Sequence, residues 1–362
     1  MKKNVFLFGA GAMIDFGGPK TDELTDKFID VLKESDWKWL VSSLDKSYGE
    51  NKYNFETILA SIESLLDWSI ASNSQGYVSV NNTSINSFLF KPNHHIPSTE
   101  IIWNNYKKLI NFIIDRISVY DNFNPKDNSH NILCEYFEKK IKNARIKVFS
   151  LNYDRLLPQI IRRKCADGTE TTNRDYAFFN YDIKGIFQSK WAYINLHGSI
   201  YLRQVPDNFY KVAQFKEPQH LENAHFCNGG SPNENKLFTP IIAGYSKSQR
   251  MLSEPFSFYI GALMADCNLC DELYIVGYSF SDPHINSILK NYIHLNKTKV
   301  IIIDKKEDID DIVNIILYKF NIICTFESTE YGYRNKEGNI LIYNKGFLKY
   351  MIDSSKNMSD FL

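Results

Sequence analysis

Residues able to bind or react with a ligand follow five apolar segments of this chain. They are Gly9-Ala10-Gly11-Ala12 after residues 5–8, Asn152 and Asp154 after 146–149, His197 after 191–194, Gly277 and Ser279 after 273–276, and Asp304 after 300–303. Small residues after a strand let backbone N–H groups approach a phosphate. Amide, carboxylate, imidazole and hydroxyl groups can hydrogen-bond the other polar groups of a nucleotide. The pattern therefore predicts one site for a polar, phosphate-bearing ligand.

The apolar segments themselves are typical of buried strands. They are separated by helical patterns such as residues 285–295 and 309–320, which predicts an α/β fold with a Rossmann-like parallel sheet covered by helices on both faces. A further short strand is expected at Leu237-Phe238. Ligands of such sheets bind at the carboxyl ends of the strands. All five groups are thus expected at one edge of the sheet.

A helical insertion is predicted after the first strand and helix. Thr21 is expected to cap the first helix ahead of Asp22 and Glu23, whose charges suit a helix N-terminus. From about residue 37 to 144, apolar residues recur mainly at intervals of three and four, as on an amphipathic helix. Residues 72–98 are rich in Asn and Ser, so we expect a long surface loop between two of these helices.

Composition excludes several classes of protein. The chain has 362 residues, 44% of them hydrophobic, with 42 basic and 42 acidic side chains, so it can bury a large core but has no net field to attract nucleic acid or an anionic membrane. Its apolar segments are too short or too often interrupted for a signal peptide or a membrane span. Six scattered cysteines argue against a secreted disulfide framework. We expect a cytoplasmic protein with reduced thiols.

Each polar group also has an ordinary structural interpretation. Asn152 and Asp154 can cap the helix that begins near Arg155, and Asp282 followed by proline can cap another helix. A single histidine such as His197 is commonly a satisfied core residue, and Asp304 can simply end its strand. Their joint placement at strand ends favours a binding site.

Four of these groups, in their order along the chain, resemble the NAD-binding blocks of the sirtuin superfamily. The blocks are Gly9-Ala10-Gly11-Ala12 with Gly18-Pro19, Leu151-Asn152-Tyr153-Asp154, Leu196-His197-Gly198, and Gly277-Tyr278-Ser279. The Asn-Tyr-Asp form and the continuation Phe280-Ser281-Asp282-Pro283 resemble the bacterial sirtuin-like domains of antiphage defence systems more than the protein deacylases. The resemblance implies a NAD-binding domain over 1–35 and 145–326, a helical insertion over 36–144 and a C-terminal extension over 327–362.

The chain departs from the deacylases at two places. Met13 stands where the sirtuin glycine loop usually has a serine, and Gly17-Gly18-Pro19-Lys20 replaces the segment with an Asp-Phe-Arg. Deacylases also resemble one another in a zinc ribbon of two cysteine pairs after the catalytic histidine. Here only Cys227 follows within that span, and the pair Cys267 and Cys270 has no second pair. We therefore expect no zinc.

The resemblance implies cleavage of the bond between nicotinamide and ribose in NAD. Asn152 would hold the attacking water or a ribose hydroxyl, and His197 would be the general base. Asp154 would accept a hydrogen bond from the nicotinamide carboxamide. The remaining expected NAD contacts are the backbone from Gly9 to Ala12 and Thr21 for the pyrophosphate, Gly277 and Ser279 for the adenosine ribose or phosphate, and Asp304 for a ribose hydroxyl.

Three functions follow from the resemblance. The first is a NAD hydrolase that depletes NAD as an antiphage effector, releasing ADP-ribose and nicotinamide. The second is a sirtuin-type protein deacylase or ADP-ribosyl transferase, and the third is a non-catalytic nucleotide-binding module of a larger assembly. An ordinary dehydrogenase is disfavoured because Ile14 stands at the third glycine position of the fingerprint.

Restraint of a toxic hydrolase implies a further component. Stand-alone sirtuin-like effectors of this size resemble those that work with a HerA-type hexameric ATPase. Aromatic residues make up 14% of the chain, and they suit either a core or an interface. We expect a homo-oligomer and a regulatory partner that contact the insertion and the tail from residue 331 to 362.

Overall fold

The computed structural model describes most of the chain. The described residues are 1–33, 37–50, 52–73, 98–161, 163, 165–171, 175–179, 183–205, 211–221, 241–244, 247–306, 309–320 and 324–356.

Eight strands form the main sheet. Across the sheet their order is β10 (Phe326–Thr329), β11 (Gly332–Asn335), β12 (Ile340–Tyr343), β9 (Lys299–Ile303), β8 (Glu272–Val276), β1 (Lys3–Phe8), β2 (Arg145–Ser150) and β5 (Trp191–Asn195). Five of them, β1, β2, β5, β8 and β9, are at the segments that the sequence predicts. From β12 to β5 all neighbours are parallel, while β10, β11 and β12 pair antiparallel. The predicted Rossmann-like sheet is confirmed, and the tail adds strands to its edge.

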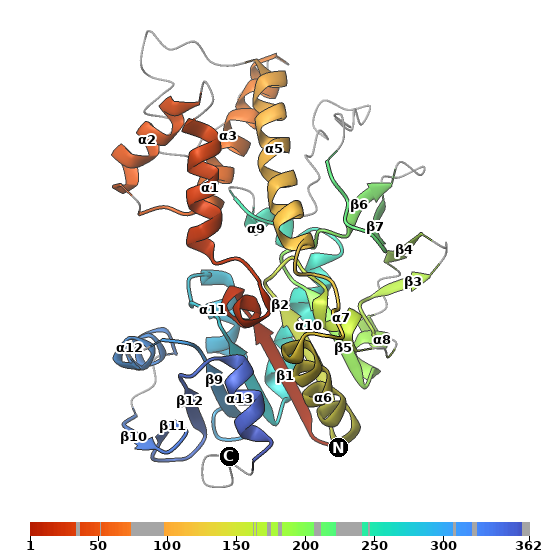
Figure 1. The fold of residues 1–362 in the computed structure, drawn as a ribbon, viewed down its shortest axis with the longest axis vertical. Coiled ribbons are helices and arrows are strands. Elements are labelled where there is room, and N and C mark those ends of the chain that lie inside the picture. The colour runs from red at the N-terminus through yellow and green to blue at the C-terminus, as the bar shows by residue number, and fades with distance from the viewer. Residues whose placement is uncertain are drawn as a thin grey trace.

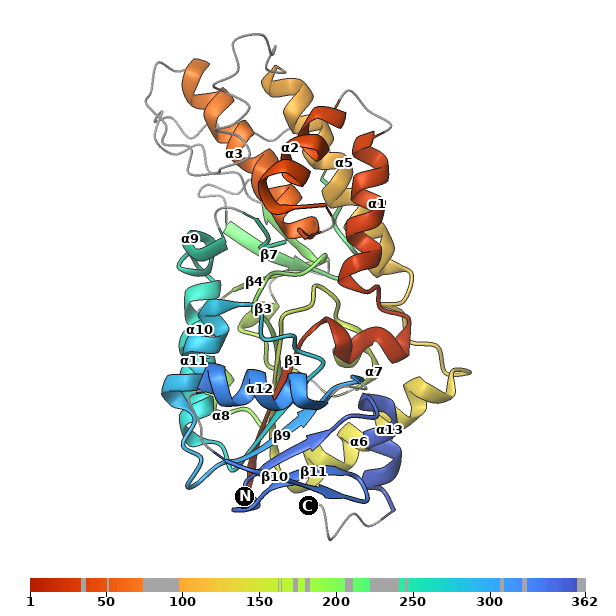
Figure 2. The same ribbon diagram turned by 90° about the vertical axis from the view of Figure 1, so that its left-hand side faces the viewer.

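Side chains of the central strands alternate between two cores. In β1, Phe6 and Phe8 lie in one hydrophobic cluster, while Val5 and Leu7 lie in the other. Because successive side chains of a strand point to opposite faces, a continuous apolar strand requires cover on both sides. One face is covered by α6 (Asn128–Asn143) and α13 (Phe347–Ser354), and the other by α8 (Ile183–Gln188), α10 (Phe256–Leu269), α11 (Pro283–Tyr292) and α12 (Ile309–Phe320) (Figure 2).

The insertion is helical, as predicted. The helices here are, in order, the first helix α1 (Thr21–Lys33) and then, within the insertion, α2 (Lys38–Tyr48), α3 (Phe55–Asn73), α5 (Thr99–Ser118) and α6. The first four pack together beyond the end of the sheet (Figure 1), whereas α6 returns to pack on β2. Helix α1 begins at Thr21, so the predicted cap is one residue late and Lys20 precedes the helix. Most of the predicted loop at 72–98 lies outside the described residues.

Two features were not predicted. A small antiparallel sheet has the order β3 (Thr169–Thr171), β4 (Tyr176–Phe179), β7 (Lys211–Phe215) and β6 (Leu202–Val205). The short helices α7 (Leu156–Ile160) and α9 (Lys247–Met251) follow β2 and precede α10. The predicted strand at 237–238 lies outside the described residues.

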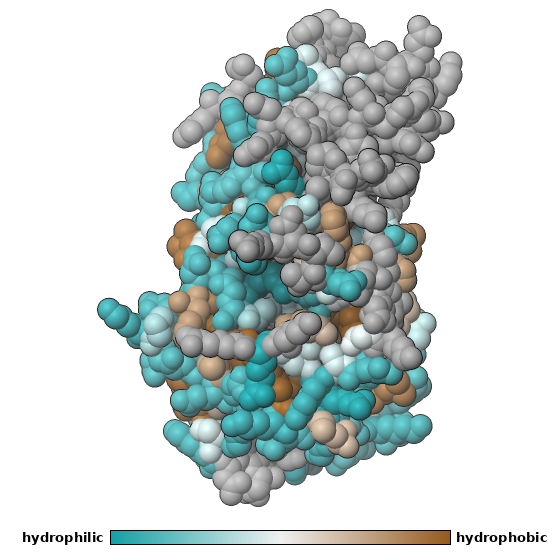
Figure 3. All heavy atoms as spheres, turned by 90° about the vertical axis from the view of Figure 1, so that its right-hand side faces the viewer, coloured by the Kyte–Doolittle hydropathy of each residue, from teal (hydrophilic) through white to brown (hydrophobic). Residues whose placement is uncertain are grey.

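The surface of the described part is largely polar on the face drawn in Figure 3, where hydrophobic side chains form small separate groups. Within the described segments, no helix is both long and apolar enough to cross a membrane.

Candidate functional site

A cleft of about 800 Å³ lies at the carboxyl ends of the central strands, facing the insertion. Eight of the predicted site residues line it: Gly9, Ala10, Gly11, Thr21, Asn152, His197, Gly277 and Ser279. They come from segments up to 270 positions apart, since residue 9 lies beside residue 279. The parallel sheet brings them together because its strands all end at this edge.

The loops after β1 and β8 approach so closely that both need glycine. A Cβ on Gly9 would lie 2.4 Å from the carbonyl oxygen of Gly277, and one on Gly277 would lie 2.2 Å from the backbone nitrogen of Ala12. Gly277 also has a φ of +56°, which L side chains rarely adopt. The glycine loop is therefore built first of all for contact between two protein loops.

Several backbone N–H groups of this loop already have partners within the protein. The Gly11 N–H donates to the Gly277 carbonyl at 2.9 Å, and the Ala12 N–H donates to the Gly9 carbonyl at 3.0 Å. Ala12 is fully buried, whereas Ala10 is exposed and begins the 3-10 helix η1 (Ala10–Phe16), where a first N–H has no helical partner. The groups placed to meet a phosphate are therefore the Ala10 N–H and the start of α1 at Thr21.

Asn152 connects the loop after β2 to the glycine loop. Its side-chain Nδ2 donates to the carbonyl of Gly9 at 2.9 Å, and its own carbonyl accepts from Nδ2 of Asn195 at 2.9 Å. The side chain of Asn152 lines the cleft. Its oxygen, Oδ1, is on the opposite side of the amide from Nδ2 and can accept a hydrogen bond from a ligand. The residue thus has both a structural bond and a polar atom suited to a ligand.

Asp154 lies beside the cleft rather than in its lining. The residue is 0% exposed. Its Oδ1 accepts from the Leu156 N–H at 3.2 Å, at the start of α7, and its Oδ2 accepts from the Tyr120 hydroxyl at 3.2 Å. Burial raises the pKa of this carboxyl to about 6. The geometry matches the helix-capping interpretation, and the side chain that lines the cleft here is Tyr120.

His197 follows β5 and is buried, with 3% of its surface exposed. Its Nε2 lies 3.3 Å from Oδ2 of Asp282, and that oxygen lies 2.9 Å from Nζ of Lys247. Burial and the neighbouring Lys247 charge lower the pKa of His197, although Asp282 raises it. The imidazole is therefore neutral near pH 7 and able to accept a proton.

Asp304 lies in a second hollow of about 400 Å³. The two hollows share lining residues, among them Gly11, Lys20 and Gly277, so they adjoin. Asp304 directly follows β9, and burial raises the pKa of its carboxyl. The predicted residues therefore lie along two adjacent hollows, with His197 in one and Asp304 in the other.

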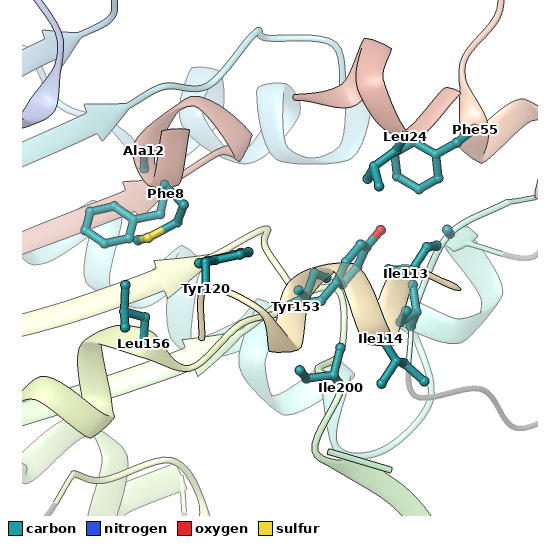
Figure 4. Packing of buried hydrophobic residues seen from close by; sticks show 14 of the residues in the cluster. Phe8, Ala12, Leu24, Phe55, Ile113, Ile114, Tyr120, Tyr153, Leu156 and Ile200 are labelled. Carbon is teal, nitrogen blue, oxygen red and sulfur yellow. The ribbon is translucent and has the colours of Figure 1, made fainter. Parts of the chain in front are cut away.

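Sequence reasoning missed the residues that the insertion and α9 bring to the cleft. The main ones are Glu56, Tyr120 and Lys247. Tyr153, beside Asn152, also lines the cleft and belongs to the same buried cluster as Leu24, Phe55 and Ile113 (Figure 4). The helical pattern of the insertion gave no sign of this placement. For Tyr153, the flanking Asn152 and Asp154 were the available signal.

Among the described residues, no three His, Cys, Asp or Glu side chains are gathered so as to hold a metal ion. Cys267 and Cys270 are buried at the end of α10. Cys227 lies outside the described residues.

A comparison with protein-family models agrees with the resemblance seen in the blocks. Residues 146–322 match the family model described as a SIR2-like domain. A solved structure of a mutant Sir2 homologue in complex with 2'-O-acetyl ADP ribose is similar over 84% of this chain and 81% of that chain, with 14% identity and a TM-score of 0.40. No curated protein sequence matches the chain.

Proposed function

We propose that this protein is a NAD hydrolase that cleaves NAD to ADP-ribose and nicotinamide. The observation that carries the proposal is the meeting of Asn152 and His197 with the glycine loop in one cleft, and both residues lie within the segment that matches the SIR2-like family model. A non-catalytic binding module would have no need of a neutral, buried histidine beside an amide side chain at the ligand.

The two adjoining hollows suit a dinucleotide. The larger, at about 800 Å³, is within the range of roughly 300–1,000 Å³ common for small-molecule pockets. We place the nicotinamide ribose near Asn152 and His197, the pyrophosphate near Ala10 and Thr21, and the adenosine toward Asp304. Lys20 lines both hollows and can offset phosphate charge.

In the proposed reaction, a water oxygen bonds to C1' of the nicotinamide ribose as the C1'–N bond breaks. The bonding electrons leave with nicotinamide, which becomes neutral, and the water proton passes to His197. Asn152 orients the water or a ribose hydroxyl through its amide. The sugar is cation-like in this transition state, so orientation and exclusion of other nucleophiles are the main contributions of the protein.

Nicotinamide release from NAD by the purified full-length protein tests the proposal. Asn152→Ala and His197→Ala should each lower the rate by roughly 100-fold or more, since general-base catalysis contributes about that much. Matched controls are Asn291→Ala and His294→Ala, two exposed side chains on or after α11. Absence of release by the wild type, alone or with the product of the neighbouring gene, would overturn the proposal.

The biological role that we propose is NAD depletion during phage infection, in the cytoplasm. A self-assembled form and a regulatory partner such as a HerA-type hexameric ATPase would restrain the activity. Survival of infected cells that carry the wild type or His197→Ala tests this role. Co-purification of the intact chain with the neighbouring ATPase tests the partner.

A further inference from the structure

His197 adjoins a network of buried and partly buried charged side chains from three separate elements. Asp282 precedes α11, Lys247 begins α9 and Glu56 lies in the first turn of α3. Lys247 Nζ lies 2.9 Å from Oδ2 of Asp282 and 3.4 Å from Oε2 of Glu56. His197 and Asp282 are both less than 10% exposed.

Asp282 uses its two oxygens for different purposes. Oδ1 accepts from the N–H groups of His284 at 2.9 Å and Ile285 at 3.3 Å, and so caps α11. Oδ2 is 3.3 Å from Nε2 of His197. Both of these facing atoms are buried, and their 3.3 Å contact lacks the alignment of a hydrogen bond. A helix cap alone explains Oδ1, whereas Oδ2 faces both His197 and Lys247.

We infer that Asp282 is a positioning residue for His197, and that Lys247 keeps this carboxylate ionised. An ionised Asp282 can only accept, so it selects the tautomer of His197 with the proton on Nε2. Nδ1 then carries the lone pair and is the basic nitrogen. The cap fixes the carboxylate on a rigid helix end, which sets the orientation of the imidazole. The inference rests on the proposed hydrolase function.

Asp282 and Lys247 act on His197 with opposite electrostatic signs. The negative charge of Asp282 raises the pKa of His197, and that of Glu56 does so as well, while the positive charge of Lys247 lowers it. Loss of the Asp282 charge should therefore lower the pKa of His197. Loss of the Lys247 charge should raise it. A residue whose charge does not act on His197 would produce neither shift.

Asp282→Asn is the central variant, because asparagine caps helices about as well as aspartate. When the amide oxygen of the new side chain caps the helix, the NH2 group of the same side chain faces His197. Because an NH2 group donates, it favours the tautomer of His197 that has no proton on Nε2. We expect kcat for nicotinamide release to fall roughly 100-fold or more, with KM changed much less. The acid limb of the pH profile should move to lower pH. In Lys247→Gln, the acid limb should move to higher pH.

Asp127→Asn is the matched control. Asp127 caps α6 through the Ser129 N–H at 2.8 Å, on a helix outside the cleft. This variant should keep the wild-type kcat and pH profile. The inference is overturned if Asp282→Asn loses no more activity than Asp127→Asn, or if the two cleft variants shift the acid limb in the same direction.

A direct titration separates the inference from the proposed function. The pKa of His197 can be measured by NMR in intact protein labelled at histidine Cε1, with His197→Gln to assign the signal. We expect a lower pKa in Asp282→Asn and a higher one in Lys247→Gln, whether or not NAD is cleaved. Unchanged values in both variants would overturn the inference even in an active hydrolase. Opposite shifts without any nicotinamide release would leave the pairing intact and overturn the hydrolase.

Discussion

The two ends of the cleft are built in different ways. At the glycine-loop end, the segments after β1 and β8 meet backbone to backbone, as the 2.9 Å bond from Gly11 to Gly277 shows. At the His197 end, Lys247 of α9 pairs with both Glu56 of α3 and Asp282. The first end depends on small residues next to strands, and the second on ion pairs between distant elements.

The difference has a physical consequence for how each end tolerates change. Backbone contact within 3 Å leaves no room for an extra atom, because both partners are held by the sheet. Ion pairs of long side chains can adjust their geometry. When one partner of a buried pair is removed, however, the remaining buried charge strongly lowers the stability of the fold. Substitutions at the glycine-loop end should therefore destabilise the protein through steric overlap. Substitutions at the His197 end should destabilise it by leaving a charge unpaired.

The largest effect is expected from Gly277→Ala. The new Cβ would lie 2.2 Å from the Ala12 nitrogen, at a φ of +56°. We expect a loss of more than about 4 kcal/mol in the free energy of unfolding, together with loss of nicotinamide release. Urea denaturation measures the first and the NAD assay the second.

Gly261→Ala in α10 is the control for this change. A Cβ at Gly261 meets nothing within 4 Å, so alanine should stabilise the helix by about 0.5–1 kcal/mol. A Gly277→Ala protein as stable as Gly261→Ala would contradict the close packing of the two loops.

The second effect concerns the buried ion pair that joins α9 to the insertion. Arg250 Nη1 lies 3.1 Å from Oε1 of Glu63, which also accepts from the Tyr106 hydroxyl at 2.7 Å. Arg250→Met leaves the Glu63 charge buried, so we expect a loss of about 3–5 kcal/mol in chemical denaturation.

Joint replacement by Arg250→Met and Glu63→Leu removes both charges. This double variant should be less destabilised than Arg250→Met alone, because no unpaired charge remains. Equal losses in the two proteins would show that packing of α9, and not the charge pair, joins the insertion to the rest.

The sheet and the glycine-loop end could be predicted from the sequence because their signals are local. Continuous apolar strands such as residues 5–8 and 300–303 require cover on both faces, and polar residues directly after them share one edge. Lys247 and Glu56 carry no such signal, since charged residues on short or amphipathic helices usually face solvent. Their place in the cleft depends on how the insertion packs, which puts Phe55 in the same buried cluster as Tyr153 (Figure 4).

A third, smaller effect should appear in the pH dependence of stability. Burial raises the folded-state pKa of Asp154 to about 6, from about 3.9 in an unfolded chain. Its contribution to stability is therefore full below pH 3.9 and is lost as the pH rises through 6. Asp121 is also buried, and the Asp154 charge adds to the rise in its pKa.

Asp154→Asn removes this titration. Between pH 7 and pH 5, the wild type should gain about 1 kcal/mol relative to the variant in the free energy of unfolding. Parallel curves of stability against pH for the two proteins would contradict a raised pKa at Asp154. The result also bears on the site, because a protonated Asp154 would be a donor beside Tyr120.

The smallest effect is expected at an ion pair of the insertion that faces solvent. Arg116 Nη2 lies 2.5 Å from Oε1 of Glu23, and the side chains are 36% and 41% exposed. Water and salt screen such pairs, so Glu23→Gln should cost less than about 1 kcal/mol, and high salt should reduce the loss further. Nicotinamide release should be unchanged. If Glu23→Gln lowered the free energy of unfolding as much as Arg250→Met does, the contribution of an ion pair to stability in this protein would not depend on burial of its charges. It would depend on where the pair lies in the fold.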